Sequence, residues 1–130
     1  MIGPFNRIML EEVKRWISKA ESDLKNAEDN LNINNYELSS FLSQQAVEKA
    51  LKSLQIKTEK KFTKTHDILF LAKKLNLPKK LLNHCDKLNP VYIETRYPDA
   101  SGEFASYTKE ESEEDLGSAK EVLAWIGKKL

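Results

Sequence analysis

The residues with the most distinctive chemistry lie in the stretch YIETRYPDASGEF at positions 92–104. Arg96 carries a forked, permanently charged guanidinium, which suits a phosphate or a carboxylate. Tyr97 and Asp99 follow it closely, so a hydroxyl and a carboxylate stand beside this cation in the sequence. The combination indicates an anion-binding site. The alternative is structural, with Arg96 paired to a glutamate of a neighbouring helix, most plausibly Glu48.

Histidine is the side chain best suited to acid/base chemistry near neutral pH, and it occurs only as His66 and His84. We expect His66 to start a helix and to help cap it, while a role in acid/base chemistry or ligand binding stays open. His84 and Cys85 are adjacent, so on a helix they point about 100° apart, which is poor for joint metal binding. The sequence also has no Gly-rich phosphate loop. We therefore predict no metal site and no cofactor.

Lysine is concentrated in residues 57–64, where four lysines fall within eight positions. The ordinary interpretation of such a charge run is a solvated loop, and the functional one is a surface that faces phosphate. Both stay open. The formal net charge of the whole chain is only +1, which excludes a generally electropositive protein and gives generic nucleic-acid binding no support.

The element that must position these residues is a central helix over residues 38–54, which holds no Gly or Pro and is rich in helix formers. It carries two apolar stripes on nearly opposite sides, one made by Val47, Ala50, Leu51 and Leu54, the other by Leu38, Phe41 and Leu42. Such a helix has to be covered twice, once by the core of the monomer and once by a further helix, which could belong to a second subunit. Polar residues interrupt the second side. We expect the ligand site to combine them with the distinctive stretch, as the set Gln45, Glu48, Lys49, Arg96, Tyr97 and Asp99.

Apolar residues spaced three or four apart predict further helices at about residues 9–31, 66–76, 78–97 and 108–130. Trp16 is the expected buried anchor of the first. The fourth should kink at Pro90, the alternative being a new segment that Asn89 caps. Residues 1–8 are predicted to be an N-terminal arm, because Gly3-Pro4 disfavours an earlier helix start. Residues 9–130 then form a single domain of the all-α class.

The cellular setting is also constrained by composition. One cysteine rules out an intramolecular disulfide. No apolar run is long enough to span a bilayer, and the first ten residues lack the features of a signal peptide. We therefore expect no membrane association and a cytoplasmic location.

Four short motifs, taken together, resemble the HEPN domain family. They are Asp23-Leu24 with Ala27, the stretch QAVEKALK at positions 45–52, His66-Asp67-Ile68, and Arg96-Tyr97-Pro98-Asp99. The resemblance extends from about Val13 to Leu130. It implies an up-and-down bundle of four main helices with a short additional one, and a homodimer. For prokaryotic members it also implies pairing with a minimal nucleotidyltransferase in toxin–antitoxin or related modules.

The resemblance further implies that some members are metal-independent ribonucleases, whose motif is an Arg, a polar residue, a few residues and then a His. Arg96 would occupy the Arg position, but residues 97–107 contain no His. RNA cleavage through the 2′-hydroxyl needs an acid/base pair, so this motif is incomplete. We therefore expect a non-enzymatic module that binds a nucleotide, RNA or a nucleotidyltransferase partner. The alternatives are a ribonuclease toxin, with Arg96 on the phosphate and Tyr97 or His66 in acid/base work, and a purely structural dimerisation domain.

Overall fold

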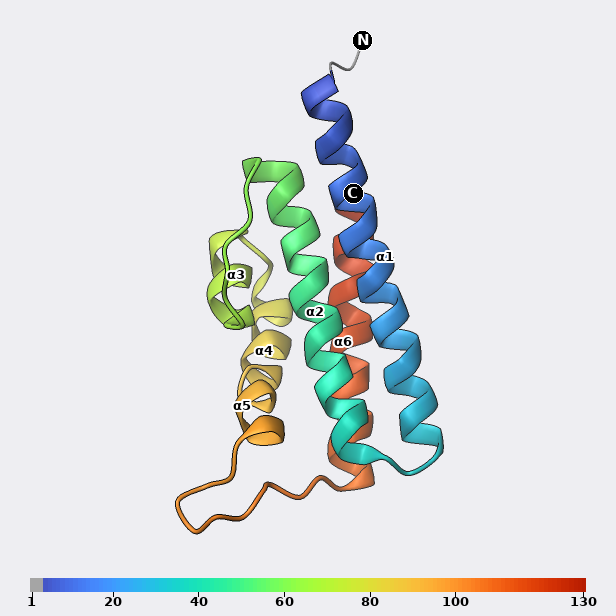
Figure 1. Cartoon of the computed structure of the whole chain (residues 1–130), viewed down its shortest axis with the longest axis vertical. Coiled ribbons are helices and arrows are strands. Elements are labelled where there is room, and N and C mark those ends of the chain that lie inside the picture. The colour runs from blue at the N-terminus through green and yellow to red at the C-terminus, as the bar shows by residue number, and fades with distance from the viewer. Residues whose placement is uncertain (1–3) are drawn as a thin grey trace.

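The computed structural model describes the backbone of residues 4–130 and the side chains from Arg7 onward, and every regular element in this part of the chain is helical (Figure 1). The helices are α1 (Pro4–Asn32), α2 (Tyr36–Glu59), α3 (Ile68–Lys74), α4 (Lys79–Leu88), α5 (Val91–Arg96) and α6 (Lys109–Lys129). The predicted all-α class is confirmed. None of the helices within residues 4–130 combines the length and hydropathy that a bilayer crossing requires.

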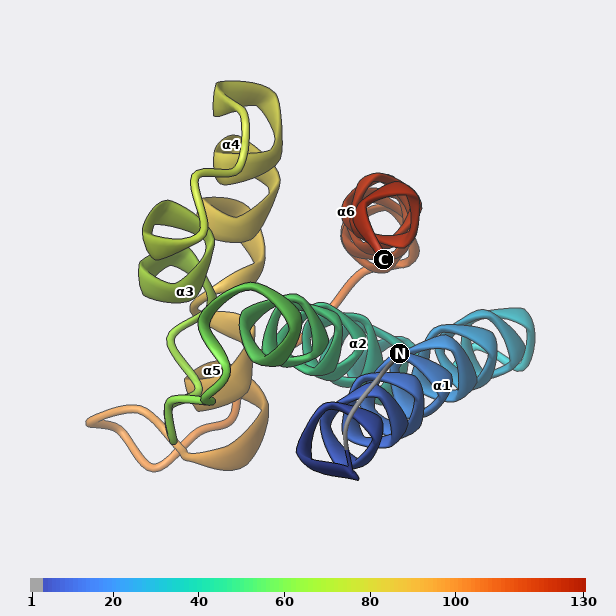
Figure 2. The same cartoon turned by 90° about the horizontal axis from the view of Figure 1, so that it is seen from above.

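The helix α2 lies at the centre of the arrangement. It forms an antiparallel hairpin with α1, and Asn34 closes the short turn between them in the left-handed backbone conformation, with φ 66°. Viewed along the bundle, α1 and α6 flank α2 on one side while α3, α4 and α5 lie on the other (Figure 2). The helix is therefore covered from several directions, as its two apolar stripes predict.

The hydrophobic core is built mainly from one stripe of α2. Its members Val47, Ala50, Leu51 and Leu54 are buried against small and aliphatic side chains of the other helices. The second stripe is less covered, since Leu38 keeps 39% of its surface exposed and Phe41 is only partly buried. One side of the central helix thus stays open to a ligand or a partner.

The N-terminal boundary differs from the prediction of an arm at residues 1–8. Helix α1 begins at Pro4. Proline is favourable at the first position of a helix, because the N–H that it lacks would have no partner there and its ring fixes φ near the helical value. Residues 1–3 lie outside the described part of the chain. The first turns of α1 extend past the ends of α2 and α6 (Figure 1). Trp16, the expected buried anchor, is only partly buried, and the buried apolar residues of α1 are Val13, Ala20 and Ala27.

The predicted kinked fourth helix is two helices, with the break at Asn89-Pro90. Asn89 stabilises this break, because its Oδ1 accepts from the Ile68 N–H at 3.0 Å and its Nδ2 donates to Asp67 Oδ1 at 3.0 Å. Asp67 is in turn the N-cap of α3 and accepts from the Phe70 N–H at 2.9 Å. Asn89 therefore ties the start of α5 to the start of α3, and both carry candidate site residues.

Candidate functional site

Arg96 is the last residue of α5, and its guanidinium lies over the ring of Tyr92, one turn earlier. The Cζ atom is 5.0 Å from the ring centroid, within the range of a cation–π contact. Among the side chains of residues 7–130, no carboxylate lies within ion-pair distance of this guanidinium, and Arg96 is exposed. The charge of Arg96 is therefore available to a ligand.

The alternative in which Arg96 pairs with Glu48 is wrong, because Glu48 is engaged by two other groups. Its Oε2 accepts from Lys52 Nζ at 3.1 Å, and its Oε1 lies 2.7 Å from His66 Nδ1. The side chains of Glu48 and Lys52 are almost fully buried. Buried carboxylates are rarely left without a cationic or hydrogen-bonding partner, and Lys52 lies one helical turn away.

His66 reaches the site from the loop between α2 and α3. Its ring stacks on Tyr92 with 4.0 Å between centroids and 13° between planes, and half of its side chain, 52%, is exposed. When Nδ1 donates its proton to Glu48, Nε2 is left as an acceptor in the neutral ring. His66 and Arg96 thus both lie within 5.0 Å of the same tyrosine ring centroid.

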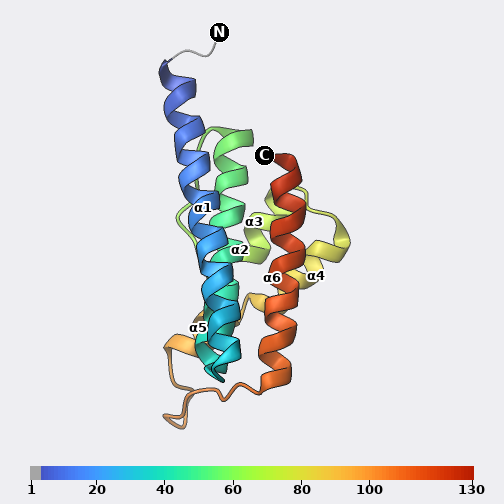
Figure 3. The same cartoon turned by 90° about the vertical axis from the view of Figure 1, so that its right-hand side faces the viewer.

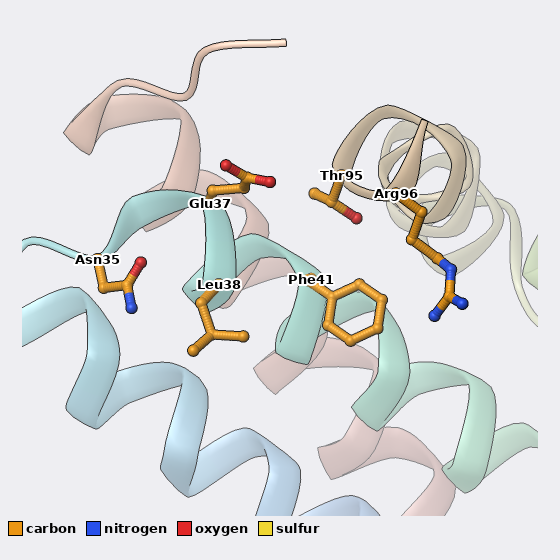
Figure 4. A pocket seen from close by; sticks show the side chains of 6 residues that line it. All are labelled: Asn35, Glu37, Leu38, Phe41, Thr95 and Arg96. Carbon is orange, nitrogen blue, oxygen red and sulfur yellow. The ribbon is translucent and has the colours of Figure 1, made fainter. Parts of the chain in front are cut away.

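Two hollows adjoin this stack of side chains. One, of about 310 Å³, is lined by His66, Asp67, Asn89, Tyr92 and Ile93. The other, of about 280 Å³, lies between the start of α2 and the end of α5 and is lined by Asn35, Glu37, Leu38, Phe41, Thr95 and Arg96 (Figure 4). The ring of Phe41 faces the space beside Arg96 and lies 6.4 Å from Tyr92 between centroids. The site therefore brings together a guanidinium cation and an imidazole on the ring of Tyr92.

The comparisons with known proteins decide the family. The family model of the HEPN domain matches residues 13–130. The chain belongs to the HEPN domain family. A search of curated proteins finds no match.

Three solved structures are similar to this chain. TT1696 from Thermus thermophilus is 34% identical with a TM-score of 0.82, and the match covers 91% of this chain and 98% of that one. ST0689, an archaeal HEPN homologue, is 30% identical with a TM-score of 0.76, over 90% and 96% of the two chains. A HEPN domain protein from Thermotoga maritima, tm0613, shares the fold at 21% identity and a TM-score of 0.71, over 88% and 95%.

Not all of the expected ligand residues of this HEPN domain converge on Arg96. Lys49 pairs with the buried Asp23 of α1, and Gln45 Nε2 donates to Gln44 Oε1 at 2.7 Å. The side chains of Lys49 and Gln45 therefore bind partners other than Arg96. The sequence pattern could not predict the pairing of Lys49 with Asp23, because a lysine at this position of α2 can reach either of two flanking helices.

Asp99 and Tyr97 lie beyond the end of α5. Asp99 organises its own loop, since its Oδ1 accepts from the N–H groups of Ser101 at 2.8 Å and Glu103 at 3.2 Å. The hydroxyl of Ser101 also donates to it, and this bond, followed by the backbone bonds, lowers the pKa of the fully exposed carboxyl. Tyr97 is 54% exposed. The carboxylate of Asp99 is thus engaged by its own loop, whereas Tyr97 is an exposed ring next to Arg96 in the chain.

Tyr92 contacts both His66 and Arg96 in the candidate site, but it lay outside the set of residues predicted from the sequence. Its spacing of four residues before Arg96 was the available signal, since such pairs share a helix face. The contact between Tyr92 and His66 has no such signal in the sequence, because His66 lies in the loop before α3, far from Tyr92 along the chain. Burial raises the pKa of the Cys85 thiol to about 12, which disfavours the reactive thiolate.

Proposed function

We propose that this HEPN domain is a nucleotide- or RNA-binding module that uses Arg96 as its phosphate-binding group. The observation that carries the proposal is the exposed guanidinium on Tyr92, which has no carboxylate partner among the described side chains. A guanidinium donates two parallel hydrogen bonds to a phosphate, and the aromatic ring beneath holds it in place. The exposed ring of Tyr97, the next residue in the chain, supplies a surface on which a base can stack.

Binding measurements on one variant and one control test this proposal. Wild type, Arg96→Ala and Arg15→Ala would be titrated calorimetrically with ATP and with short single-stranded RNA. Arg15 is an exposed arginine on α1 whose partner is Glu12, so its loss removes the same charge elsewhere. The proposal predicts weaker binding only for Arg96→Ala. Equal binding by all three proteins, or binding by none, would remove Arg96 from the site.

The partner that this proposal includes is a minimal nucleotidyltransferase, in the setting of a toxin–antitoxin-like module. The support is an exposed apolar surface on α5 and the following loop, where Ile93, Tyr97 and Phe104 each expose more than half of their surface. Co-purification with a small nucleotidyltransferase encoded beside this chain tests it. Separate elution of the two proteins at micromolar concentrations would count against the pairing.

A second candidate function is metal-independent RNA cleavage, favoured by the position of His66. Glu48 fixes the ring through Nδ1, so Nε2 can take the proton of a 2′-hydroxyl while Arg96 neutralises the phosphate. The 2′-oxygen then bonds to phosphorus, and the departing 5′-oxygen takes up a proton from an acid, for which Tyr97 is the nearest candidate in sequence. Incubation with RNA in the presence of a chelator tests this reaction. Cleavage that survives both His66→Ala and Arg96→Ala would exclude it.

A further inference from the structure

The charges of this chain are strongly segregated along its sequence, although its formal net charge is only +1. Residues 57–80 hold eight lysines and two acidic residues, which gives this segment a net charge of +6. Residues 94–115 hold eight acidic residues and two basic ones, which gives a net charge of −6. A composition total hides this asymmetry, because the two segments cancel.

The fold carries the end of α2 and the loop before α6 to opposite ends of the bundle (Figure 1), and the two segments meet where His66 and Arg96 both contact the Tyr92 ring. We call residues 57–80, together with Lys128 and Lys129, the basic end. The Lys57 ammonium joins α2 to the end of α6, because it donates to the carbonyls of Lys129 at 2.9 Å and Leu130 at 2.8 Å. The acidic end comprises residues 94–115, which form the end of α5, the long loop and the start of α6. Figures 1 and 3 show that loop at the end of the bundle away from the C-terminus.

The loop between α2 and α3 leads from the basic end to the Arg96 site. It is held against the bundle at several points: Phe62 packs on Trp16 at 5.8 Å between centroids, the Thr63 N–H donates to Gln55 Oε1 at 2.8 Å, and His66 stacks on Tyr92. The lysines of this loop are exposed, and none is within ion-pair distance of a carboxylate in the described part of the chain; they are Lys60, Lys61 and Lys64. Three ammonium groups without a carboxylate partner among the described side chains therefore precede His66, on a loop that these contacts hold against the bundle.

We infer that this loop, with Lys60, Lys61 and Lys64, forms a track for the phosphate backbone of single-stranded RNA that starts at Arg96. The inference rests on the proposed function of Arg96 and deepens it, because it selects an RNA of several nucleotides over a mononucleotide. The chain from Lys60 to His66 spans at most roughly 20 Å, room for more than one phosphate. In the other direction, Glu94, Asp99 and Glu103 repel a polyanion. The strand therefore leaves the site toward Lys64 and Lys60 only.

Fluorescence anisotropy with two labelled RNAs, a uridine trinucleotide and a uridine dodecanucleotide, tests the track. The variant Lys60→Gln/Lys61→Gln/Lys64→Gln removes the loop charges. The control Lys25→Gln/Lys109→Gln/Lys120→Gln makes the same charge change at exposed lysines elsewhere, each in a long surface pair of 3.5 to 3.8 Å. All six positions are exposed, so both variants are expected to fold, which circular dichroism checks.

We expect wild type to bind the dodecanucleotide at least about tenfold more tightly than the trinucleotide, a difference of about 1.4 kcal/mol. The loop variant should lose that advantage while it keeps its affinity for the trinucleotide. Its slope of log affinity against log salt should be shallower by about 2, since each phosphate contact contributes about 0.7 for a single strand. Equal losses in the loop variant and the control, or an advantage that persists in the loop variant, would overturn the track.

The same titrations separate this inference from the proposal for Arg96. If Arg96→Ala weakens binding of both RNAs but the loop variant behaves as wild type, the phosphate site stands and the track is wrong. If Arg96→Ala binds both RNAs as wild type does, the proposed function of Arg96 fails and the track that starts there fails with it. Equal affinity for a twelve-base-pair duplex and for the dodecanucleotide would overturn single-stranded RNA as the ligand.

Discussion

At the residue scale, the site depends on one buried carboxylate with two partners. Glu48 is held by Lys52 from its own helix and by His66 from the following loop. Lys52 also lies 5.5 Å from the ring centroid of Trp16, so aromatic surface covers its charge. The position of His66 on Tyr92, and with it the proposed chemistry, follows from this arrangement.

Replacing the buried carboxylate should therefore be costly. Glu48→Gln leaves the ammonium of Lys52 buried without a countercharge, and we expect a loss of about 3–5 kcal/mol in the free energy of unfolding. Urea unfolding of wild type and variant measures it. Glu121→Gln, at an exposed partner of Lys80, should change little. The double variant Glu48→Gln/Lys52→Met should recover much of the loss; a single variant as stable as wild type would contradict the buried pair.

At the element scale, the sequence predicts most of the fold, because apolar spacing along a helix depends on few local rules. The spacing identifies α1, α2 and α6, and Thr108 caps α6 by accepting from the Glu111 N–H at 3.1 Å. It does not decide between a kink and a break at Pro90. That choice depends on the bonds of Asn89 to α3, a contact between residues about twenty positions apart that no local pattern encodes.

The partners of the site residues could not be predicted either, because they too are contacts between residues far apart in the sequence. Glu48 could pair with any hydrogen-bond donor that the fold brings to α2, and only the course of a loop selects His66 over Arg96. The exposed position of Arg96, in contrast, agrees with an anion-binding role read from its side chain alone.

The junction of α4 and α5 gives a test at this scale. Asn89→Ala removes two hydrogen bonds and leaves the Ile68 N–H without its acceptor, so we expect a loss of about 1–3 kcal/mol in the free energy of unfolding. Asn83→Ala, at an exposed position of α4, is the control. Equal effects of the two substitutions in urea unfolding would show that the junction is not held by Asn89.

The packing of α6 against α2 predicts a dependence on pH. Burial, partly opposed by the bond with Ser40, raises the pKa of Asp115 above its ordinary value of 3.8. A carboxyl with a raised folded-state pKa favours folding while it is protonated, and this contribution is lost as the pH rises through that pKa. We therefore expect Asp115→Asn to be more stable than wild type at neutral pH, with the gain vanishing below pH 3.8.

Thermal unfolding of both proteins across this pH range measures the difference. Glu114→Gln, at an exposed neighbour that pairs with Lys87, is the control and should show no such trend. A gain for Asp115→Asn that is constant with pH would rule out ionisation of this carboxyl as its cause.

At the scale of the whole molecule, the open side of α2 and the segregation of charge both bear on assembly. The half-covered stripe with Leu38 and Phe41 agrees with the expected homodimer, in which a second subunit covers this side. Light scattering should then give twice the chain mass of 15.0 kDa. Leu38→Lys would place a charge in that contact, and we expect it to raise the dimer dissociation constant by at least about tenfold.

Ile33→Lys is the control for the dimer, since Ile33 is 71% exposed in the turn after α1 and should not affect assembly. Wild type that scatters as a monomer at micromolar concentrations would contradict the dimer. A Leu38→Lys variant that stays dimeric would place the contact elsewhere on the molecule.

The most direct test of the central claim, that Arg96 on Tyr92 receives a phosphate, is a crystal structure with a bound uridine trinucleotide. We predict a phosphate oxygen within hydrogen-bond distance of the Arg96 guanidinium, with the Tyr92 ring still beneath it. RNA bound elsewhere on the protein, with Arg96 left in solvent, would contradict the account.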